Sequence, residues 1–187
     1  MDKSHLVIEE SSRVLEFWFN ELTPSQWFTQ DSALDRTIAS QFLTLHRAAS
    51  QGELWPWRAT PSGRLAEILL LDQFSRNIYR DTPHAFSQDP MALVLAQEAR
   101  SVEADKTLTP QQCIFLYMPF MHSESLAIHD IALQLFAVPG LEQQYEYELK
   151  HVNIIKQFGR YPHRNLVLGR TSTKEEEAFL LKPGSRF

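Results

Sequence analysis

Apolar residues recur at steps of three and four along most of this chain, which is the spacing that places side chains on one face of an α-helix. The clearest stretch lies between Asp31 and Gly52, and its apolar positions are Leu34, Ile38, Phe42, Leu45 and Ala49. Aspartate is a common helix N-cap, and glycine commonly ends a helix. Because no segment shows sustained alternation of apolar and polar residues, the pattern predicts an all-α protein with no sheet.

Proline, glycine and capping residues divide the chain into about seven or eight predicted helices. Besides the helix between Asp31 and Gly52, these are one that begins at Ser11 or Ser12, one over 62–77, one from an Asp89 cap to about 104, one from a Thr109 cap that Pro119 breaks or kinks, one over 124–136, one over 141–158, and a short last one capped by Thr173 and Glu176. Short loops between medium-length helices favour antiparallel neighbours. With no linker or repeated unit, a single domain over 1–187 is predicted.

Composition narrows the class of protein. The chain has 187 residues, 43% of them hydrophobic and 22% charged, with a net charge of −5. An acidic balance argues against a general nucleic-acid binder. The single cysteine, Cys113, cannot form an intramolecular disulfide, and no apolar run approaches the length of a membrane span. With no signal-peptide pattern at the start, a cytoplasmic location away from membranes is expected.

A basic loop follows the helix predicted over 141–158. Gly159 offers a left-handed stop to that helix, and Pro162 keeps the next residues out of it. No acid occurs from 149 to 174, whereas the candidate ligand-binding residues of this loop are Arg160, His163, Arg164, Asn165 and Arg170. A solvated basic face is the simpler interpretation. Arginine nevertheless outnumbers lysine in the loop, and its planar guanidinium suits bidentate pairing with a carboxylate or a phosphate.

Polar residues also follow the apolar run 68–71, which is apolar all round and predicts a buried helix. Asp72 and Arg76 are four residues apart, as are Gln73 and Asn77, so each pair shares a helix face. One interpretation is a surface ion pair. The other is a buried polar group, in which Arg76 seeks a further acid or a ligand anion.

The triplet His122-Ser123-Glu124 comes just after Pro119 and has four interpretations. Ser123 could cap the next helix, or the triplet could be a hydrolytic group, although no nucleophile elbow is present. It could also bind a metal ion together with His151 or His163, but no usual ligand spacing occurs. Lastly, Glu124 could be the counter-charge of a loop arginine. The sequence assigns no catalytic residue, no metal site and no cofactor.

Three runs carry a family resemblance: 69–77 (LLLDQFSRN), 117–124 (YMPFMHSE) and 158–165 (FGRYPHRN), the last continuing through Gly169-Arg170. They resemble the bacterial family called domain of unknown function 924, and the likeness spans nearly the whole chain. The resemblance implies helix hairpins stacked in a tetratricopeptide-like right-handed superhelix, and it implies no catalytic residues because the family has no established activity. One departure is His129-Asp130, where more ordinary polar residues would be expected.

These features support three functional hypotheses. The first is a cytoplasmic binding or interaction module that holds an anionic small molecule or an acidic peptide at the basic loop, backed by Asp72, Arg76 and Glu124. The second is an enzyme that acts on a phosphorylated or carboxylated metabolite and uses one of the three histidines named above for proton transfer. The third is a self-satisfied network that only fixes helix packing. Charge balance predicts one cluster of Asp72, Arg76, His122, Glu124, Arg160 and Arg164.

Overall fold

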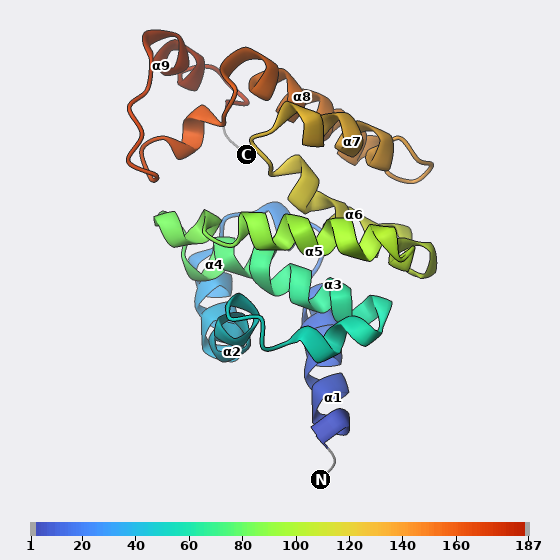
Figure 1. Cartoon of the computed structure of the whole chain (residues 1–187). Helices are drawn as coiled ribbons and strands as arrows, with labels where there is room; N and C mark the ends of the chain where they lie inside the picture. The colour runs from blue at the N-terminus through green and yellow to red at the C-terminus, as the bar shows by residue number, and fades with distance from the viewer. Residues whose placement is uncertain (1–2, 186–187) are drawn as a thin grey trace.

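The computed structural model describes residues 3–185. Within this range every regular element is a helix, and no strand is present (Figure 1). The predicted all-α class is therefore confirmed for the described range. Residues 3–185 contain nine α segments, and because α3 and α4 belong to one continuous helix, these make eight helices. The tetratricopeptide-like stacking of hairpins stays a prediction. None of the helices within residues 3–185 combines the length and the apolar character needed to cross a membrane.

The first helix, α1 (Lys3–Glu16), widens at its C-terminal end into a π turn over Phe17–Glu21. It runs straight through Ser11 and Ser12, so the prediction that one of these serines caps it was wrong. The reason is that the residues before the serines are already helical, which leaves no free N-terminus for a serine to cap.

Three other predicted caps are confirmed. The Oδ1 atom of Asp31 accepts hydrogen bonds from the backbone N–H groups of Ala33 at 2.7 Å and Leu34 at 3.3 Å, at the start of α2 (Ser32–Ser50). The remaining two are full capping boxes: Thr109 with Gln112 before α6 (Pro110–Met121), and Thr173 with Glu176 before α9 (Lys174–Leu180).

A long central helix runs through the core. It consists of α3 (Pro61–Leu69), a π turn over Leu70–Phe74 and α4 (Ser75–Ile78), and the backbone stays helical at both junctions. The four side chains of 68–71 are completely buried, as their all-round apolar pattern predicted. Burying each of them contributes roughly 1.5–3 kcal/mol. The structure thus fixes the position of this helix, and with it the polar residues that follow, by apolar packing.

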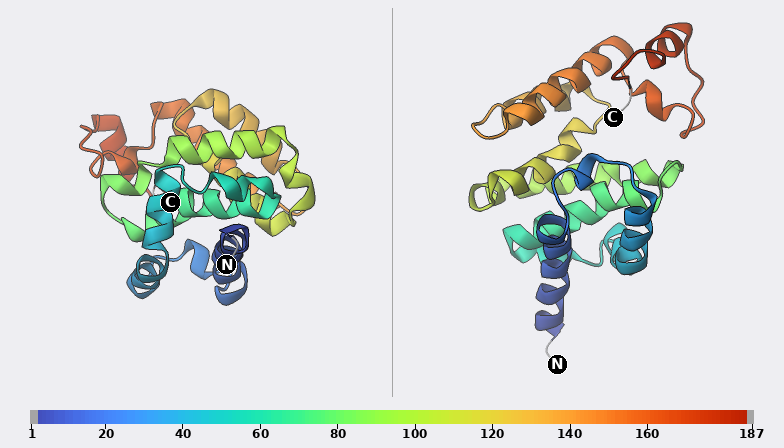
Figure 2. Two further views of the ribbon diagram at one scale, coloured as in Figure 1. Left: turned by 60° about the horizontal axis from the view of Figure 1, so that its bottom comes forward. Right: turned by 180° about the vertical axis from the view of Figure 1, so that it is seen from behind.

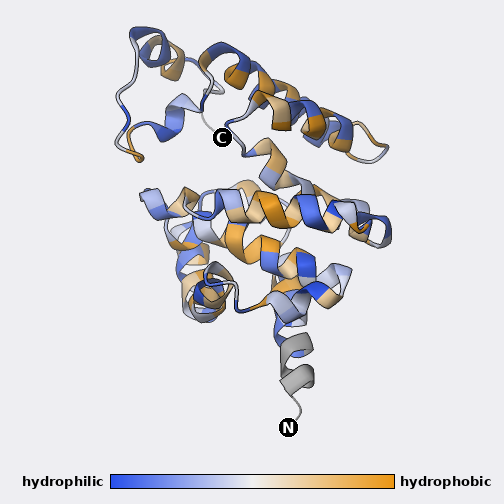
Figure 3. Ribbon diagram, in the orientation of Figure 1, coloured by the Kyte–Doolittle hydropathy of each residue, from blue (hydrophilic) through white to orange (hydrophobic). Residues whose placement is uncertain are grey.

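Two further helices, α5 (Asp89–Ser101) and α6, contact α3 in the central helix. Figure 3 shows the apolar segments of α5 and α3 next to each other. Of the two predicted effects of Pro119, a break of α6 was wrong, since the helix continues to Met121. A kink at this residue stays a prediction. Pro119 lacks one backbone donor, but it lies in the last turn, and the surrounding side chains from 113 to 121 are all buried.

The C-terminal part forms a second layer (Figure 1, Figure 2). There α7 (Leu126–Phe136) packs against both α6 and α8 (Glu142–Phe158). Gly159 ends α8 in the left-handed conformation, with φ at 68°, as predicted. The chain then turns through the short helix Pro162–Arg164, which brings the basic loop back towards the start of α5.

Gly63 provides a test of the packing in α3. A Cβ atom at this position would overlap the backbone carbonyl of Trp57, which cannot move as freely as a side chain end. We expect Gly63→Ala to lower the free energy of unfolding by about 1–3 kcal/mol or more, although alanine is the better helix former. Chemical denaturation of this variant and of Ser62→Ala, which changes an exposed neighbour, measures the effect. Equal stabilities for the two variants would contradict the close approach.

Candidate functional site

The central π turn positions the first acid of the site. A π turn holds one more residue than a regular helical turn and shifts its hydrogen bonds. Within this turn, the carbonyl group of Asp72 accepts a hydrogen bond from Nη1 of Arg76 at 2.8 Å, and the carbonyl group of Leu71 accepts one from Oγ of Ser75 at 2.6 Å. Side chains of the following turn therefore supply donors to the backbone of the widened turn.

The carboxylate of Asp72 is almost completely buried, with a side chain that is 1% exposed. It contacts Nη1 of Arg76 at 3.0 Å, Nδ1 of His122 at 2.7 Å and Nε2 of Gln73 at 2.6 Å. Burial alone would raise the pKa of this carboxyl group, but the charge of Arg76 and the two further hydrogen bonds hold it well below its usual value. Asp72 is thus an ionised carboxylate in the protein interior.

A second acid, Asp89, joins the central helix to the basic loop. Its two oxygens accept hydrogen bonds from Nη1 and Nη2 of Arg76, at 2.9 and 3.0 Å. The Oδ2 atom also accepts one from Nη1 of Arg164 at 3.3 Å. The prediction that Asp89 caps the next helix was wrong: Gln88 holds the cap position, and Asp89 is the first residue of α5. We call Asp72, Arg76, Asp89, His122 and Arg164 the polar centre.

Arg164 is held between two aromatic rings. Its guanidinium carbon lies 4.7 Å from the ring centroid of Phe86 and 4.6 Å from that of Tyr161. The hydrogen bond to Asp89 is the one that this side chain makes to the described part of the protein, and its buried Nε–H group has no partner there. Burial and the neighbouring charge of Arg76 lower the pKa of Arg164. Arg164 is therefore a positioned guanidinium with donors left over.

His122 has one ring nitrogen occupied and one available. Because Asp72 is ionised, Nδ1–H of His122 donates to it, which leaves Nε2 as an acceptor. Nε2 makes no hydrogen bond to any residue between 3 and 185, and the side chain is 15% exposed. Burial and the charge of Arg76 lower the pKa of His122. The geometry is that of a neutral imidazole held by a carboxylate.

A buried chain of polar groups lies behind the polar centre. The hydroxyl group of Tyr161 donates to the carbonyl of Met121 at 2.5 Å and lies 3.1 Å from Nε2 of His129. Nδ1 of His129 is 2.5 Å from Oε1 of Glu148, and both side chains are completely buried. Burial raises the pKa of Glu148. His129, noted in the sequence as a departure from the family pattern, is therefore a core residue, whereas Asp130 is exposed.

Glu124 lies beside the polar centre as the counter-charge of a loop arginine. Its carboxylate accepts two hydrogen bonds from Arg170, at 2.6 and 2.9 Å, and one from the backbone N–H of Tyr161 at 2.7 Å. This contact selects the fourth of the interpretations given for the His122-Ser123-Glu124 triplet. Ser123 does not cap α7, whose N-cap position is Ser125.

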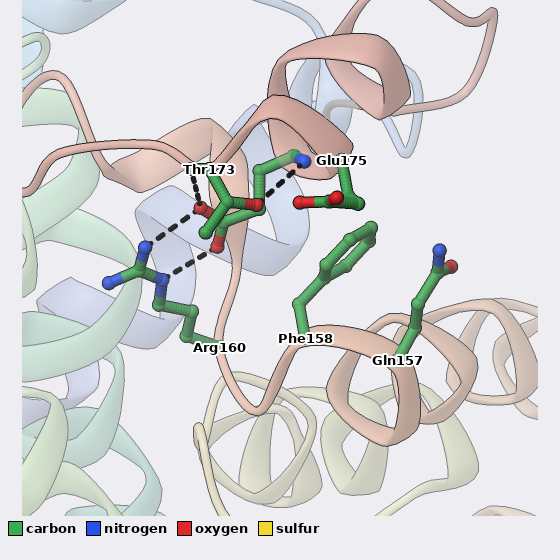
Figure 4. Close-up of a pocket in the computed structure, with 6 residues that line it drawn as sticks. Gln157, Phe158, Arg160, Thr173 and Glu175 are labelled. Carbon is green, nitrogen blue, oxygen red and sulfur yellow. Dashed lines mark hydrogen bonds and ion pairs between the residues drawn. The ribbon is translucent and has the colours of Figure 1, made fainter.

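Arg160 lies outside the polar centre, so the prediction that it belongs to one cluster with Asp72 was wrong. Its guanidinium makes two hydrogen bonds to Glu176, at 2.7 and 2.8 Å. Asn165 also donates to Glu176, at 3.2 Å. Figure 4 shows Arg160 on one side of a cavity of about 480 Å³ and Phe158 on the other. Arg160 pairs with Glu176 and not with Asp72 because the capping box of α9 fixes the Glu176 carboxylate close to Arg160.

The other predicted residues have separate places. Asn77 donates to Asp35 at 2.8 Å, whereas Gln73, four residues before it, donates to Asp72. Nδ1–H of His151 donates to the carbonyl of Tyr147 at 2.7 Å, and burial lowers the pKa of His151 to about 3. The ring of His163 lies 5.6 Å from that of Tyr161. Within residues 3–185, no group of three or more His, Cys, Asp or Glu side chains is arranged to hold a metal ion.

Asp89 is the residue that holds both arginines, which makes it the sharpest test of the polar centre. We expect Asp89→Ala to lower the free energy of unfolding by about 3 kcal/mol, because two partly buried guanidinium groups lose their carboxylate. Asp130→Ala, which removes an exposed aspartate on α7, is the matched control and should change stability by less than about 0.5 kcal/mol. A loss from Asp89→Ala within the range of the control would mean that the centre does not depend on this contact.

Comparison with known proteins agrees with these motifs. The model of a family described as bacterial protein of unknown function (DUF924) matches residues 14–184. The solved structure of ATU0120, a protein of unknown function from Agrobacterium tumefaciens, is 35% identical to this chain with a TM-score of 0.88, and the match covers 94% of this chain and 98% of that one. No curated protein matches significantly. The chain therefore belongs to the DUF924 family.

Proposed function

We propose that this protein is a binding module for an anionic small molecule and that the ligand contacts the polar centre. The proposal rests mainly on the unused hydrogen-bond donors of Arg164. Arg76 makes two short hydrogen bonds to Asp89, whereas Arg164 makes one contact to the same carboxylate at 3.3 Å and keeps unused donors. A carboxylate or phosphate group can accept from a planar guanidinium in two places, which Asp89 does not do for Arg164.

His122 supports a second requirement on the ligand. Its Nε2 atom is an acceptor without a partner among the described residues, and it belongs to the same centre through Asp72 and Arg76. A ligand that carries a hydroxyl or amino group next to its anionic group would satisfy both His122 and Arg164. This arrangement favours a hydroxylated or aminated acid, or a phosphorylated metabolite with such a group.

The exposure of the polar centre favours a small ligand over an acidic peptide. The side chains of Arg76, Asp89 and Arg164 are 20%, 16% and 8% exposed. Such narrow access suits one anionic group. An extended peptide needs a continuous open surface for its backbone, as in the known peptide-recognition modes.

The proposal predicts a specific effect of Arg164→Gln. Asp89 keeps its two hydrogen bonds to Arg76 in this variant, so we expect the free energy of unfolding without ligand to fall by less than about 2 kcal/mol. An anion that stabilises the parent protein should no longer stabilise the variant, since ligand at a hundred times its Kd adds about 2.7 kcal/mol only where it binds.

Thermal melts of the parent, Arg164→Gln and the exposed control Arg36→Gln measure this effect. They are recorded with sulfate, phosphate and a panel of phosphorylated or hydroxylated carboxylic acids. If no anion stabilises the parent and Arg164→Gln alone costs about 3–5 kcal/mol, the arginine is a structural partner of a buried acid. The network would then serve helix packing, as the third hypothesis holds.

The Asp72–His122 pair favours an enzyme as a second candidate. A buried carboxylate that fixes the tautomer of a neutral imidazole, with Nε2 left free, is the arrangement of a general base. In this reading His122 takes a proton from a hydroxyl or amino group of the ligand, while Arg76 and Arg164 hold its anionic group.

Acylation by diethyl pyrocarbonate tests the state of His122, because this reagent attacks neutral imidazole. We expect acylation of His122 to keep its full rate at a pH below 6.5, where free N-acetylhistidine loses reactivity, since the pKa of His122 is lowered. Mass spectrometry of the modified peptide gives the rate at each pH. Two results would rule out His122 as a general base. One is that His122 does not react; the other is that its rate is half-maximal at a higher pH than the rate of N-acetylhistidine.

A further inference from the structure

A second cavity lies where α2 packs against α4. Figure 1 shows these two helices side by side. Its volume is about 250 Å³, and it opens between α2, the end of α4 and the segment Pro83–Phe86. The lining residues are all able to form hydrogen bonds: His46, Arg47, Ser50, Gln51, Tyr79, His84, Ser87 and Gln88. None of these residues belongs to the polar centre, and none carries a negative charge.

The hydrogen bonds around His46 fix its tautomer. Oγ of Ser75 donates its hydrogen to the carbonyl of Leu71 at 2.6 Å, so it can only accept from His46. Nε2 of His46 lies 2.7 Å from this Oγ and must therefore carry the ring hydrogen. The other nitrogen, Nδ1, is left as an acceptor.

Nδ1 of His46 is a buried acceptor without a partner. The residue is 3% exposed, and no hydrogen bond reaches Nδ1 from the described part of the chain. Burial lowers the pKa of His46 to about 4, so the ring stays neutral near pH 7. A buried acceptor without a donor destabilises the protein, and a donor that enters through the cavity would recover this free energy.

The other lining side chains give the cavity a positive charge and an aromatic surface. Arg47 is exposed and forms no ion pair with a described residue. The rings of His46, Tyr79 and His84 follow one another, with centroids 5.2 Å and 5.6 Å apart. Oγ of Ser50 and Oγ of Ser87 donate to carbonyl groups of their own turns. The donors left for a ligand are therefore Arg47, the two glutamine amides, Tyr79 and the ring N–H of His84.

From this arrangement we propose that the cavity is a second ligand site, separate from the polar centre, for a small oxyanion that retains a proton. Its oxygens accept hydrogen bonds from Arg47 and the amides, and its O–H group donates to Nδ1 of His46. Hydrogen phosphate has both features. Sulfate has the same shape and a similar charge but no O–H group near pH 7, so it leaves the buried acceptor unsatisfied and places an oxygen lone pair against it.

Isothermal titration of the full chain with phosphate and with sulfate tests the proposal. We expect sulfate to bind at least about tenfold more weakly at this site, which corresponds to one lost hydrogen bond to a buried acceptor. A long-range ¹H–¹⁵N spectrum of the histidine rings should show the Nε2–H tautomer for His46 and a shift of its Nδ1 signal with phosphate. Equal affinities for the two anions, or an unchanged Nδ1 signal, would overturn the proposal.

Variants separate this site from the polar centre. Arg47→Gln should weaken phosphate binding by about tenfold or more, because it removes a charge-assisted hydrogen bond. Arg36→Gln changes the same charge on an exposed turn of α2 outside the cavity and should leave the affinity unchanged. Arg164→Gln should also leave the His46 signal and the phosphate affinity of this site unchanged. If Arg47→Gln behaves like Arg36→Gln, or if Arg164→Gln removes the shift of the His46 signal, the second site does not exist.

Discussion

The central π turn over Leu70–Phe74 is the constraint on which both candidate sites depend. Completely buried apolar residues fix the helix around it, and the turn itself contains the buried carboxylate of Asp72. Directly after it, Ser75 and Arg76 direct their side chains back to its carbonyl groups. Because Ser75 then accepts from His46 and Arg76 binds Asp89, one local irregularity places polar groups on two sides of the same helix.

An ion pair connects the basic loop to the helices of the first layer. Asp89 and Arg164 are 75 residues apart in the sequence, and their contact joins the start of α5 to the turn after α8. The polar centre contains two carboxylates and two guanidinium groups, and its histidine is neutral, so the charges balance. A balanced centre can be held in the interior, and the uneven division of Asp89 between two arginines leaves one of them with donors for a ligand.

Much of the candidate site was visible in the sequence because its residues lie in short polar motifs next to apolar runs. Asp72, Arg76, His122 and Arg164 were identified in this way. Glu124 as the partner of a loop arginine was one of four interpretations, and it is the one that the structure shows. Asp89 was missed because an Asp-Pro pair is also typical of a helix start. His46 and Glu148 gave no signal, since a single polar residue in an amphipathic helix does not reveal whether its face is buried.

The sequence by itself determined the all-α class, the capping of three helices and the left-handed stop at Gly159, because these depend on the spacing and type of neighbouring residues. It also determined which residues carry charge near the site. The tertiary structure decided how these charges pair. Arg160 binds Glu176 and not Asp72, and Asn77 binds Asp35, because side chains choose partners by distance in space. The π turn, too, was decided there, since packing and hydrogen bonds from Ser75 and Arg76 stabilise a backbone shift that leaves the apolar pattern unchanged.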